Sequence, residues 1–202
     1  MLKRLVDVLV SLLLIVFFLP ISAALALMVR CFLGSPILFY QARPGIHGEP
    51  FILMKFRTLE NRASQSDEHA SDEDRMTIFG KWLRSSSLDE LPELWNVLCG
   101  DMSLVGPRPL LMKYLPLYNE DQARRHLVKP GITGWAQVKG RNLLSWEEKL
   151  SLDVWYVDNH NFLLDVKILL MTIKQVIYRR GIAAEGHATM PAFEGKKKPP
   201  FS

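Results

Sequence analysis

The chain has 202 residues, of which 49% are hydrophobic, and a formal net charge of +4; this length allows one domain with its own core and a short appendage. Its two cysteines form no CxxC pair and its five histidines form no HExxH motif, so a zinc site and a disulfide scaffold are both disfavoured. The basic residues are scattered and match no recognition module, which disfavours nucleic-acid binding, whereas a mild positive excess suits anionic lipid or phosphorylated substrates.

The chain begins with an apolar run that carries no charge from Val8 to Val29. Its length is close to the roughly 20 residues that span a hydrocarbon core. One interpretation is a cleaved signal peptide, because Lys3 and Arg4 precede the run and residues 24–26 (Ala-Leu-Ala) resemble a cleavage site. A simple spanning helix is the second interpretation. The third is a helix that enters the membrane, breaks and returns to the side it came from.

Pro20 favours the third interpretation, since it lies near the middle of the run, where a proline deletes an i→i−4 hydrogen bond and kinks a helix. Positive residues prefer the cytoplasmic face of a membrane. They flank the run on both sides, as Lys3, Arg4, Arg30 and Arg43. Residues 1–34 are therefore predicted to form a re-entrant, broken membrane helix, although prolines also occur in ordinary spanning helices.

After the apolar run, residues 36–41 and 51–58 are expected to form two short strands joined by a turn rich in proline and glycine. Lys55 and Arg57 are two residues apart in the second strand, so they lie on one face of it. That face is either a solvated basic edge or a set of phosphate contacts, and the pattern favours neither.

The stretch from Arg84 to Pro109 contains two adjacent acids, Asp89 and Glu90, behind a run of serines. One interpretation is purely structural. Ser87 and Glu90 fit a capping box, in which the serine is the N-cap and the glutamate bonds back to its backbone N–H. Asp89 would then only favour the positive end of the helix.

The second interpretation of this stretch is catalytic. A carboxylate in a first helical turn stays ionised, and an ionised aspartate such as Asp89 can attack phosphorus. Arg84 precedes the acids and Arg108 follows the next turn, and guanidinium groups match phosphate oxygens. Together these residues describe a phosphoryl-transfer site. Any metal there is expected to be held by oxygen, which indicates magnesium or manganese.

Two segments beyond this stretch have more than one interpretation. Residues 110–118 are apolar and form either buried core or an interfacial helix. Residues 129–142 contain three glycines, which allow tight turns and close approach of the backbone to a ligand. The same segment ends with Arg141, whose side chain offers hydrogen-bond donors to a substrate.

The C-terminal part is predicted to be helical. A helix over residues 145–159, with Ser145 as its N-cap, carries Asp153, which is either an exposed helical acid or a site residue. A basic amphipathic helix over residues 162–180 suits core packing or a membrane surface. The chain ends in a basic segment, which we expect to be disordered and attracted to anionic lipid.

The expected fold is α/β, mostly helical with a short β-hairpin or small sheet. We predict three parts: a membrane helix over residues 1–34, a catalytic domain at the cytoplasmic face over residues 35–182, and a tail over residues 183–202. The sequence contains no internal repeat and no second segment with a core of its own.

Four motifs occur in order along the chain: Leu88-Asp89-Glu90-Leu91, Gly100-Asp101-Met102-Ser103, Gly106-Pro107-Arg108-Pro109 and Pro130-Gly131-Ile132-Thr133-Gly134-Trp135. With them the chain resembles the bacterial sugar transferases, and more narrowly the small monotopic phosphoglycosyl transferases of the PglC type. The likeness covers essentially the whole chain, from the apolar N-terminus through residues 185–189. It favours the catalytic interpretation of Asp89 and Glu90 and the kink at Pro20.

The resemblance implies that Asp89 and Glu90 are the catalytic dyad of a reaction in two halves. Asp89 attacks the β-phosphorus of a UDP-sugar and releases UMP, and polyprenyl phosphate, expected to be undecaprenyl phosphate, then takes the phosphosugar. Mg²⁺ is the implied cofactor, with Asp89 as a candidate ligand, and it offsets charge on the diphosphate. Glu90 either positions the metal or the acceptor, or takes a proton.

By the same resemblance, Arg108 binds phosphate, and Lys55 and Asp153 lie at positions associated with the active site. The re-entrant helix is likewise a family trait, and it implies a monotopic protein on the cytoplasmic face of the bacterial inner membrane. One departure from the family pattern is Leu19, since the family often has serine before the kink proline. Ser22 is the candidate to satisfy the freed backbone groups instead.

The ending GHATMPAFEG resembles members that use UDP-N,N′-diacetylbacillosamine, so an N-acetylated amino sugar is the expected donor. The product would enter glycoconjugate biosynthesis such as protein glycosylation, with downstream glycosyltransferases as further partners. Two other functions stay open. A membrane-anchored binding or scaffold protein would explain the apolar run and the basic tail, but not the paired acids. Direct glycosyl transfer would release UDP rather than UMP.

Overall fold

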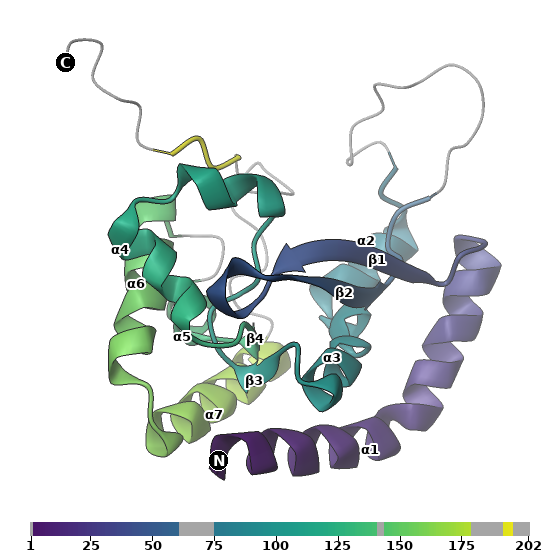
Figure 1. Cartoon of the computed structure of the whole chain (residues 1–202). Coiled ribbons are helices and arrows are strands. Elements are labelled where there is room, and N and C mark those ends of the chain that lie inside the picture. Colours follow the sequence, from purple (N-terminus) through teal and green to yellow (C-terminus); the bar gives the residue numbers. More distant parts are fainter. Residues whose placement is uncertain (1, 61–74, 141–143, 179–191, 196–202) are drawn as a thin grey trace. The chain divides into compact units, whose positions relative to one another are not determined.

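The computed structural model describes residues 2–60, 75–140, 144–178 and 192–195. The chain divides into two compact units: a first unit of Met1–Gln41 and Leu53–Cys99, and a second unit of Ala42–Ile52 and Gly100–Ser202. Helices predominate in the described residues, and the strands form two sheets of two strands each (Figure 1). The expected class, mostly helical with a small sheet, is confirmed.

The first unit begins with α1 (Leu2–Phe32), which stays helical through the whole apolar run. Figure 1 shows that α1 bends about midway along its length. Pro20 is the proline inside this helix, and a proline kinks a helix because it lacks a donor and clashes with the preceding turn. The break that the sequence predicts is therefore a bend within one continuous helix.

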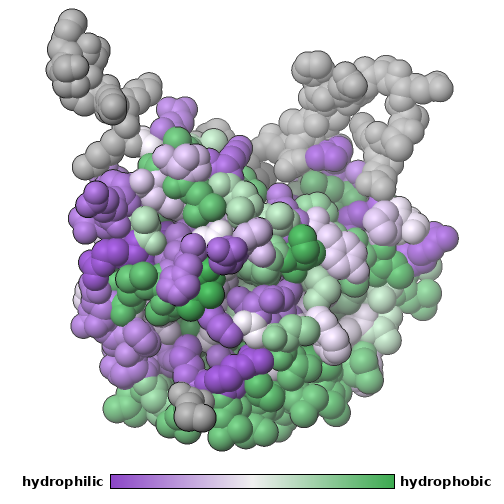
Figure 2. All heavy atoms as spheres, viewed as in Figure 1, coloured by the Kyte–Doolittle hydropathy of each residue, from purple (hydrophilic) through white to green (hydrophobic). Residues whose placement is uncertain are grey.

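Most of the α1 surface is hydrophobic and uncovered, as Figure 2 shows along this helix. In its most apolar window only 11% of the residues are buried. The exposed apolar side chains on α1 are Leu2, Leu5, Leu9, Leu12, Leu13, Val16, Phe17, Leu19, Ile21, Leu27 and Phe32. By length and composition α1 is able to cross a membrane, and an exposed apolar surface of this extent is typical of contact with lipid or a partner.

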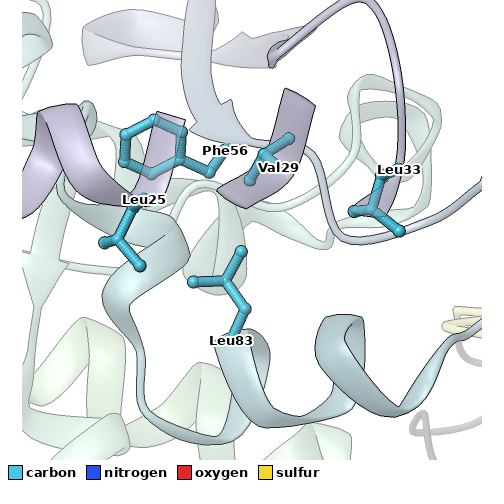
Figure 3. Packing of buried hydrophobic residues seen from close by; sticks show 5 residues of the cluster. All are labelled: Leu25, Val29, Leu33, Phe56 and Leu83. Atoms are coloured by element: carbon cyan, nitrogen blue, oxygen red, sulfur yellow. The ribbon is translucent and has the colours of Figure 1, made fainter. Parts of the chain in front are cut away.

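The core of the first unit holds the second half of α1 in place. Its buried cluster consists of Leu25, Val29 and Leu33 from the end of α1, Phe56 from β2 (Pro50–Phe56) and Leu83 from α2 (Ile78–Ser85) (Figure 3). Burying one such side chain stabilises a fold by about 1.5–3 kcal/mol. This cluster anchors the C-terminal half of α1 in the core of the first unit.

Arg57 caps the C-terminal end of α1. Its guanidinium is buried and donates hydrogen bonds to the carbonyls of Leu33 and Ser35, the latter at 3.0 Å from Nη1. A cation is favourable there because the last turn of a helix leaves carbonyls without intrahelical partners. Arg57 is thus neither the solvated edge nor the phosphate contact that the strand pattern allowed, and only Lys55 is left for the second role.

Arg4 ties the N-terminal end of α1 to α3 (Glu93–Cys99). Its Nη1 donates to the carbonyl of Val97 at 2.6 Å, and its Nη2 donates to the carbonyl of Leu98 at 2.8 Å. These carbonyls lie at the C-terminal end of α3, where a guanidinium complements the helix dipole. The membrane-type helix is therefore bonded to the helix that follows the paired acids.

The predicted β-hairpin is confirmed, with boundaries shifted by one to three residues. It consists of β1 (Leu38–Pro44), the short 3₁₀ turn η1 (Ile46–Gly48) and β2. His47 and Gly48 have φ values of 56° and 80°, which the turn accommodates with glycine at the second position. The tip of the hairpin belongs to the second unit, and its base belongs to the first.

The second unit contains a parallel sheet that the sequence did not predict. Strands β3 (Ser103–Val105) and β4 (Gly131–Thr133) pair with Ser103 opposite Gly131 and Val105 opposite Thr133. The connection between them comprises η3 (Met112–Leu117), α4 (Glu120–Ala123) and η4 (Arg124–Leu127). In η3, Tyr114 is buried, which supports the core interpretation of residues 110–118.

Three helices complete the second unit: α5 (Trp135–Lys139), α6 (Trp146–Asn159) and α7 (Phe162–Tyr178). The N-cap predicted for α6 is confirmed, since Oγ of Ser145 accepts from the backbone N–H of Glu148 at 3.2 Å within a complete capping box. The helix predicted over residues 162–180 is confirmed as far as Tyr178, because residues 179–180 lie outside the described part of the chain.

Part of the C-terminal tail packs against the rest of the second unit. Phe193 is only 7% exposed. Its ring lies 5.7 Å from that of Tyr114, 5.3 Å from that of Trp146 and 5.6 Å from that of Tyr118, measured between ring centroids. Such aromatic clusters bury a large apolar area. The segment expected to be disordered, residues 195–202, lies outside the described residues apart from Gly195.

Candidate active site

The paired acids lie in a constrained turn of the first unit. Asp89 and Glu90 belong to the 3₁₀ turn η2 (Leu88–Glu90), which precedes α3. Ser87 before them is left-handed, with φ of 57°, and its side chain makes no capping hydrogen bond. The capping-box interpretation is therefore wrong. A serine seldom adopts this conformation unless its surroundings impose it, and such strain is concentrated at functional sites.

Glu90 uses its carboxylate for a tertiary contact. Lys55 Nζ, from β2, lies 2.9 Å from Oε1 of Glu90 and 2.9 Å from Oε1 of Glu93, the first residue of α3. The Lys55 and Glu90 side chains are 16% and 18% exposed, and that of Glu93 is 2% exposed. An ammonium has three donors, so Lys55 orients both acids. Lys55 therefore lies between two carboxylates.

The expected nucleophile, Asp89, is 6% exposed. Shielding from water favours attack by a carboxylate because each electrostatic interaction is stronger there. Arg84, five residues earlier, is exposed and donates from Nη2 to the hydroxyl of Thr58 at 3.1 Å. Its guanidinium is accessible to an anionic ligand. The first unit thus brings together Lys55 and Glu90, two of the residues predicted from the sequence.

In the second unit, glycines let two motifs touch backbone to backbone. The N–H of Gly106 donates to the carbonyl of Thr133 at 2.9 Å. A Cβ on Gly131 would lie 2.1 Å from the backbone N of Gly106, and one on Gly134 would lie 2.1 Å from the carbonyl O of Gly106. These distances exclude any side chain. The glycines expected to approach a ligand instead allow this close packing of the strand β4 region against the loop that carries Arg108.

Asp153 forms a buried ion pair rather than an exposed helical acid. Oδ2 of Asp153, on α6, accepts from Nη2 of Arg125 at 2.7 Å and from Nε at 3.2 Å. The two side chains are 6% and 1% exposed. Burial raises the pKa of Asp153 above its usual value, and the charge of Arg125 opposes that shift. The carboxylate of Asp153 is therefore the ion-pair partner of Arg125.

Arg108 and Lys149 give the second unit a local excess of positive charge. Lys149 lies on α6 four residues before Asp153, on the same helical face. Burial lowers the pKa of Lys149, Asp153 opposes the shift, and the charge of Arg108 lowers this pKa further. The two cations therefore lie close enough to interact.

Sequence reasoning missed three residues of these arrangements: Glu93, Arg125 and Lys149. Only Lys149 had a visible signal, its spacing of four residues from Asp153 on one helix. The partners of Glu93 and Arg125 are distant in sequence, so spacing could not reveal them. Arg141, a predicted substrate contact, lies outside the described residues.

A magnesium site of the kind that completes its shell with substrate would use the paired acids as its protein ligands. No group of three or more metal-ligating side chains occurs among the described residues. Mg²⁺ bound to a nucleotide substrate needs only one or two carboxylates, because phosphate oxygens and water supply the other ligands. Asp89 and Glu90 are adjacent oxygen donors and meet that requirement.

Comparison with known proteins gives the family. A model of the family "bacterial sugar transferase" matches residues 1–179. The chain is 53% identical over 194 residues to the uncharacterized sugar transferase EpsL of Bacillus subtilis (strain 168), and the match covers 96% of each chain.

Longer relatives are more distant. The chain is 37% identical over 192 residues to the undecaprenyl-phosphate glucose phosphotransferase of Komagataeibacter xylinus, and 40% identical over 162 residues to the galactosyl transferase CpsE of Streptococcus agalactiae. These matches cover 88% and 73% of this chain and 36% of each relative, so the chain spans about a third of their length. Since the family match extends over most of the chain and includes the paired acids, this chain belongs to the bacterial sugar transferase family.

Proposed function

We propose that this chain moves a phosphosugar from a UDP-sugar to undecaprenyl phosphate and releases UMP. One observation carries this proposal. In a constrained turn, Asp89 is buried next to Glu90, and Lys55 holds the Glu90 carboxylate. The names of several relatives support it, since they state glucose-phosphate transfer to undecaprenyl phosphate, in some cases from UDP-glucose. Those relatives are longer proteins, so the substrates are proposed for this chain by analogy.

The reaction is proposed to proceed through a covalent intermediate. An oxygen of the Asp89 carboxylate attacks the β-phosphorus of the donor, and the bond from that phosphorus to the bridging oxygen breaks, so UMP leaves with the bridging oxygen. Asp89 then carries the phosphosugar as an acyl phosphate. A phosphate oxygen of the acceptor attacks the same phosphorus, which restores the carboxylate and yields polyprenyl diphosphate–sugar. No net proton transfer is required.

Other side chains are proposed to prepare these steps. Lys55 orients the Glu90 carboxylate through their 2.9 Å contact. Arg84 and Arg108 are proposed to hold phosphate oxygens, which guanidinium groups match in geometry and charge. Mg²⁺ on Asp89 and Glu90 would neutralise charge on the diphosphate.

The decisive experiment tests whether Asp89 is the nucleophile. Protein treated with donor and quenched before acceptor is added should show a phosphosugar adduct on Asp89 by mass spectrometry. Asp89→Asn should abolish the adduct and lower UMP release by about 10³-fold or more. Asp121→Asn removes an exposed acid of α4 and should retain full activity. Release of UDP, or UMP release that survives Asp89→Asn, would disprove the mechanism.

For the donor we propose an N-acetylated amino sugar such as UDP-N,N′-diacetylbacillosamine. The support is the likeness of the C-terminal segment, of which residues 192–195 pack onto the second unit through Phe193. Relatives are named for glucose and galactose, so these are the competing donors. A panel of UDP-sugars assayed by UMP release decides among them, and a preference for UDP-glucose would refute the amino-sugar assignment.

We further propose that the chain is monotopic, with α1 dipping into one leaflet of the inner membrane from the cytoplasmic face. The bend in α1, its exposed apolar surface and its positive flanks support this arrangement. A soluble donor and a lipid acceptor would meet at that face. Accessibility tags at the N-terminus and after Ser202 should both report cytoplasm. A periplasmic N-terminus would establish a spanning helix instead.

A further inference from the structure

Three consecutive carbonyls of the loop that carries Arg108 each accept a hydrogen bond within the second unit. The carbonyl of Pro107 accepts from the N–H of Gly131 at 3.0 Å, and that of Arg108 accepts from Nη2 of Arg125 at 2.7 Å. The carbonyl of Pro109 accepts from Nη1 of Arg43 at 3.2 Å. Because the two prolines have no N–H, their carbonyls are the only backbone groups at those positions that can be bonded.

Arg125, which donates to the carbonyl of Arg108, is itself held in place. Arg125 is 1% exposed at its side chain. One N–H of its Nη2 serves the Arg108 carbonyl and the other serves Asp153, while its Nε also donates to Asp153. The ring of Tyr118 lies 5.8 Å from the guanidinium carbon. These bonds leave from two nitrogens held in a planar fork, whereas an ammonium presents all its donors from one nitrogen on a flexible stem.

A buried ion pair is weak evidence for stability, because desolvation of both charges offsets their attraction. It does fix geometry, because the partners have one favourable arrangement. A neighbouring pair shows the contrast: Arg124 and Asp158 come from the same elements, η4 and α6, and are also ion-paired, but their side chains are 41% and 44% exposed. The Arg124–Asp158 pair joins η4 to α6 near the surface, whereas Arg125 also bonds to the Arg108 carbonyl.

We propose that Arg125 is a positioning residue for Arg108. Locked to Asp153, it holds the Arg108 carbonyl and thereby fixes the direction in which the Arg108 side chain leaves its loop. This inference rests on the proposed function, in which Arg108 binds phosphate. Small errors in the position of a phosphate ligand reduce rate strongly, since catalysis depends on preorganised charge.

The test is a double-mutant cycle on the full chain in lipid nanodiscs, with UMP release as the readout. Arg125→Lys keeps a cation beside Asp153 but loses the bond to the Arg108 carbonyl. We expect it to lower kcat/KM by about 10- to 100-fold, mainly through kcat. Arg108→Gln should lower kcat/KM by more. The double variant should equal Arg108→Gln alone, because the direction of a missing guanidinium has no effect.

Arg124→Lys is the matched control, and it should have wild-type kinetics. Losses that multiply in the double variant would overturn the inference, because Arg125 would then act independently of Arg108. So would wild-type kinetics for Arg125→Lys, or equal losses for Arg124→Lys. An Arg108→Gln variant with wild-type activity is a different result: it would remove Arg108 from the proposed function before the cycle is completed.

A structural readout accompanies the kinetics. Hydrogen exchange at the amide of Gly131, which bonds to the Pro107 carbonyl, should be faster in Arg125→Lys and unchanged in Arg124→Lys. If Arg125→Lys loses its thermal unfolding transition, Asp153→Asn replaces it in the cycle with the same expectation. Loss of that transition in both variants would show that the Arg125–Asp153 pair is required for folding, and it would refute the positioning role.

Discussion

His126 is a buried neutral histidine next to the loop that carries Arg108. Its Nδ1 lies 3.3 Å from the carbonyl O of Gly45, and its Nε2 is buried with no hydrogen-bond partner among the described residues. Burial lowers its pKa from 6.5 to about 4, and the charge of Arg125 adds to this shift. Below pH 6.5 the unfolded chain therefore binds a proton that the folded chain refuses, so the free energy of unfolding falls as the pH is lowered towards 4.

Replacing this side chain should remove that pH dependence. Between pH 7 and pH 5 the wild-type protein should lose about 1–2 kcal/mol more unfolding free energy than His126→Gln, measured by urea unfolding in detergent. The control is His160→Gln, which changes an exposed histidine at the end of α6 and should retain the wild-type slope. Identical slopes for wild type and His126→Gln would show that His126 is not held neutral.

Gly131 tests the backbone contact between two motifs. Gly131→Ala would place a Cβ 2.1 Å from the backbone N of Gly106, and neither backbone can move without breaking the β3–β4 pairing. We expect a loss of about 3 kcal/mol or more in the free energy of unfolding. Gly140→Ala is the control: its Cβ would meet the Leu144 side chain at 2.7 Å, which can rotate away. A loss no larger for Gly131 than for Gly140 would contradict this account.

At the scale of elements, the same sequence pattern was right in one place and wrong in another. Ser145, the predicted N-cap, forms a capping box with Glu148, whose side chain is exposed. Ser87 and Glu90 have the same spacing, but Lys55, distant in sequence, pairs with Glu90, and the turn before α3 becomes 3₁₀. Local propensity therefore decided only the first case.

Short strands also escaped prediction. Strands β3 and β4 have three residues each, too few to show an alternating pattern. Their pairing depends on Gly131 and Gly134, which allow close backbone contact with Gly106. From the sequence, Gly131 and Gly134 were instead expected to allow close approach to a ligand. The long apolar helix, by contrast, was predictable because its hydrophobicity needs no partner to be recognised.

Pro20 is the residue expected to cause the bend in α1. Pro20→Leu restores a hydrogen-bond donor and removes the ring clash, so α1 should straighten. A straight apolar helix of this length should span the bilayer in part of the population. We expect an N-terminal cysteine to become partly accessible to a membrane-impermeant reagent from the periplasm. Ile21→Leu, at the adjacent position, should leave it inaccessible, and unchanged accessibility in Pro20→Leu would show that Pro20 does not set the topology.

Across the whole molecule, the residue pattern left the paired acids with a structural and a catalytic interpretation, and the motifs favoured the catalytic one. The resemblance identified Asp89, Glu90 and Arg108, but the groups that orient them are long-range partners. Lys55 and Glu93 flank Glu90 in the first unit, and Arg125 holds the Arg108 loop in the second. Only a folded chain brings such partners together, so spacing along the sequence could not show them.

Each unit also exposes an apolar helix surface of its own. On α7 the exposed apolar residues begin with the adjacent Phe162 and Leu163 and then recur three or four positions apart, as Val166, Leu170, Ile173 and Val176. The opposite face buries Asp165 and Ile168, and exposed Lys167 and Lys174 border the apolar surface. An apolar face with lysines at its edge is typical of a helix that lies in a membrane interface.

This surface predicts that the second unit contacts lipid independently of α1. Leu170→Cys, labelled with an environment-sensitive dye in a Cys31→Ser, Cys99→Ser background, should shift its emission to the blue when the protein enters vesicles with anionic lipid. Glu147→Cys, at an exposed position near the start of α6, should show no shift. Burying a leucine in the interface is favourable by roughly 1–2 kcal/mol. Leu170→Glu should therefore weaken the lipid contact of the second unit. A dye on Ile173→Cys should then lose its blue shift. Equal emission at positions 170 and 147 would place α7 in water and leave α1 as the membrane contact.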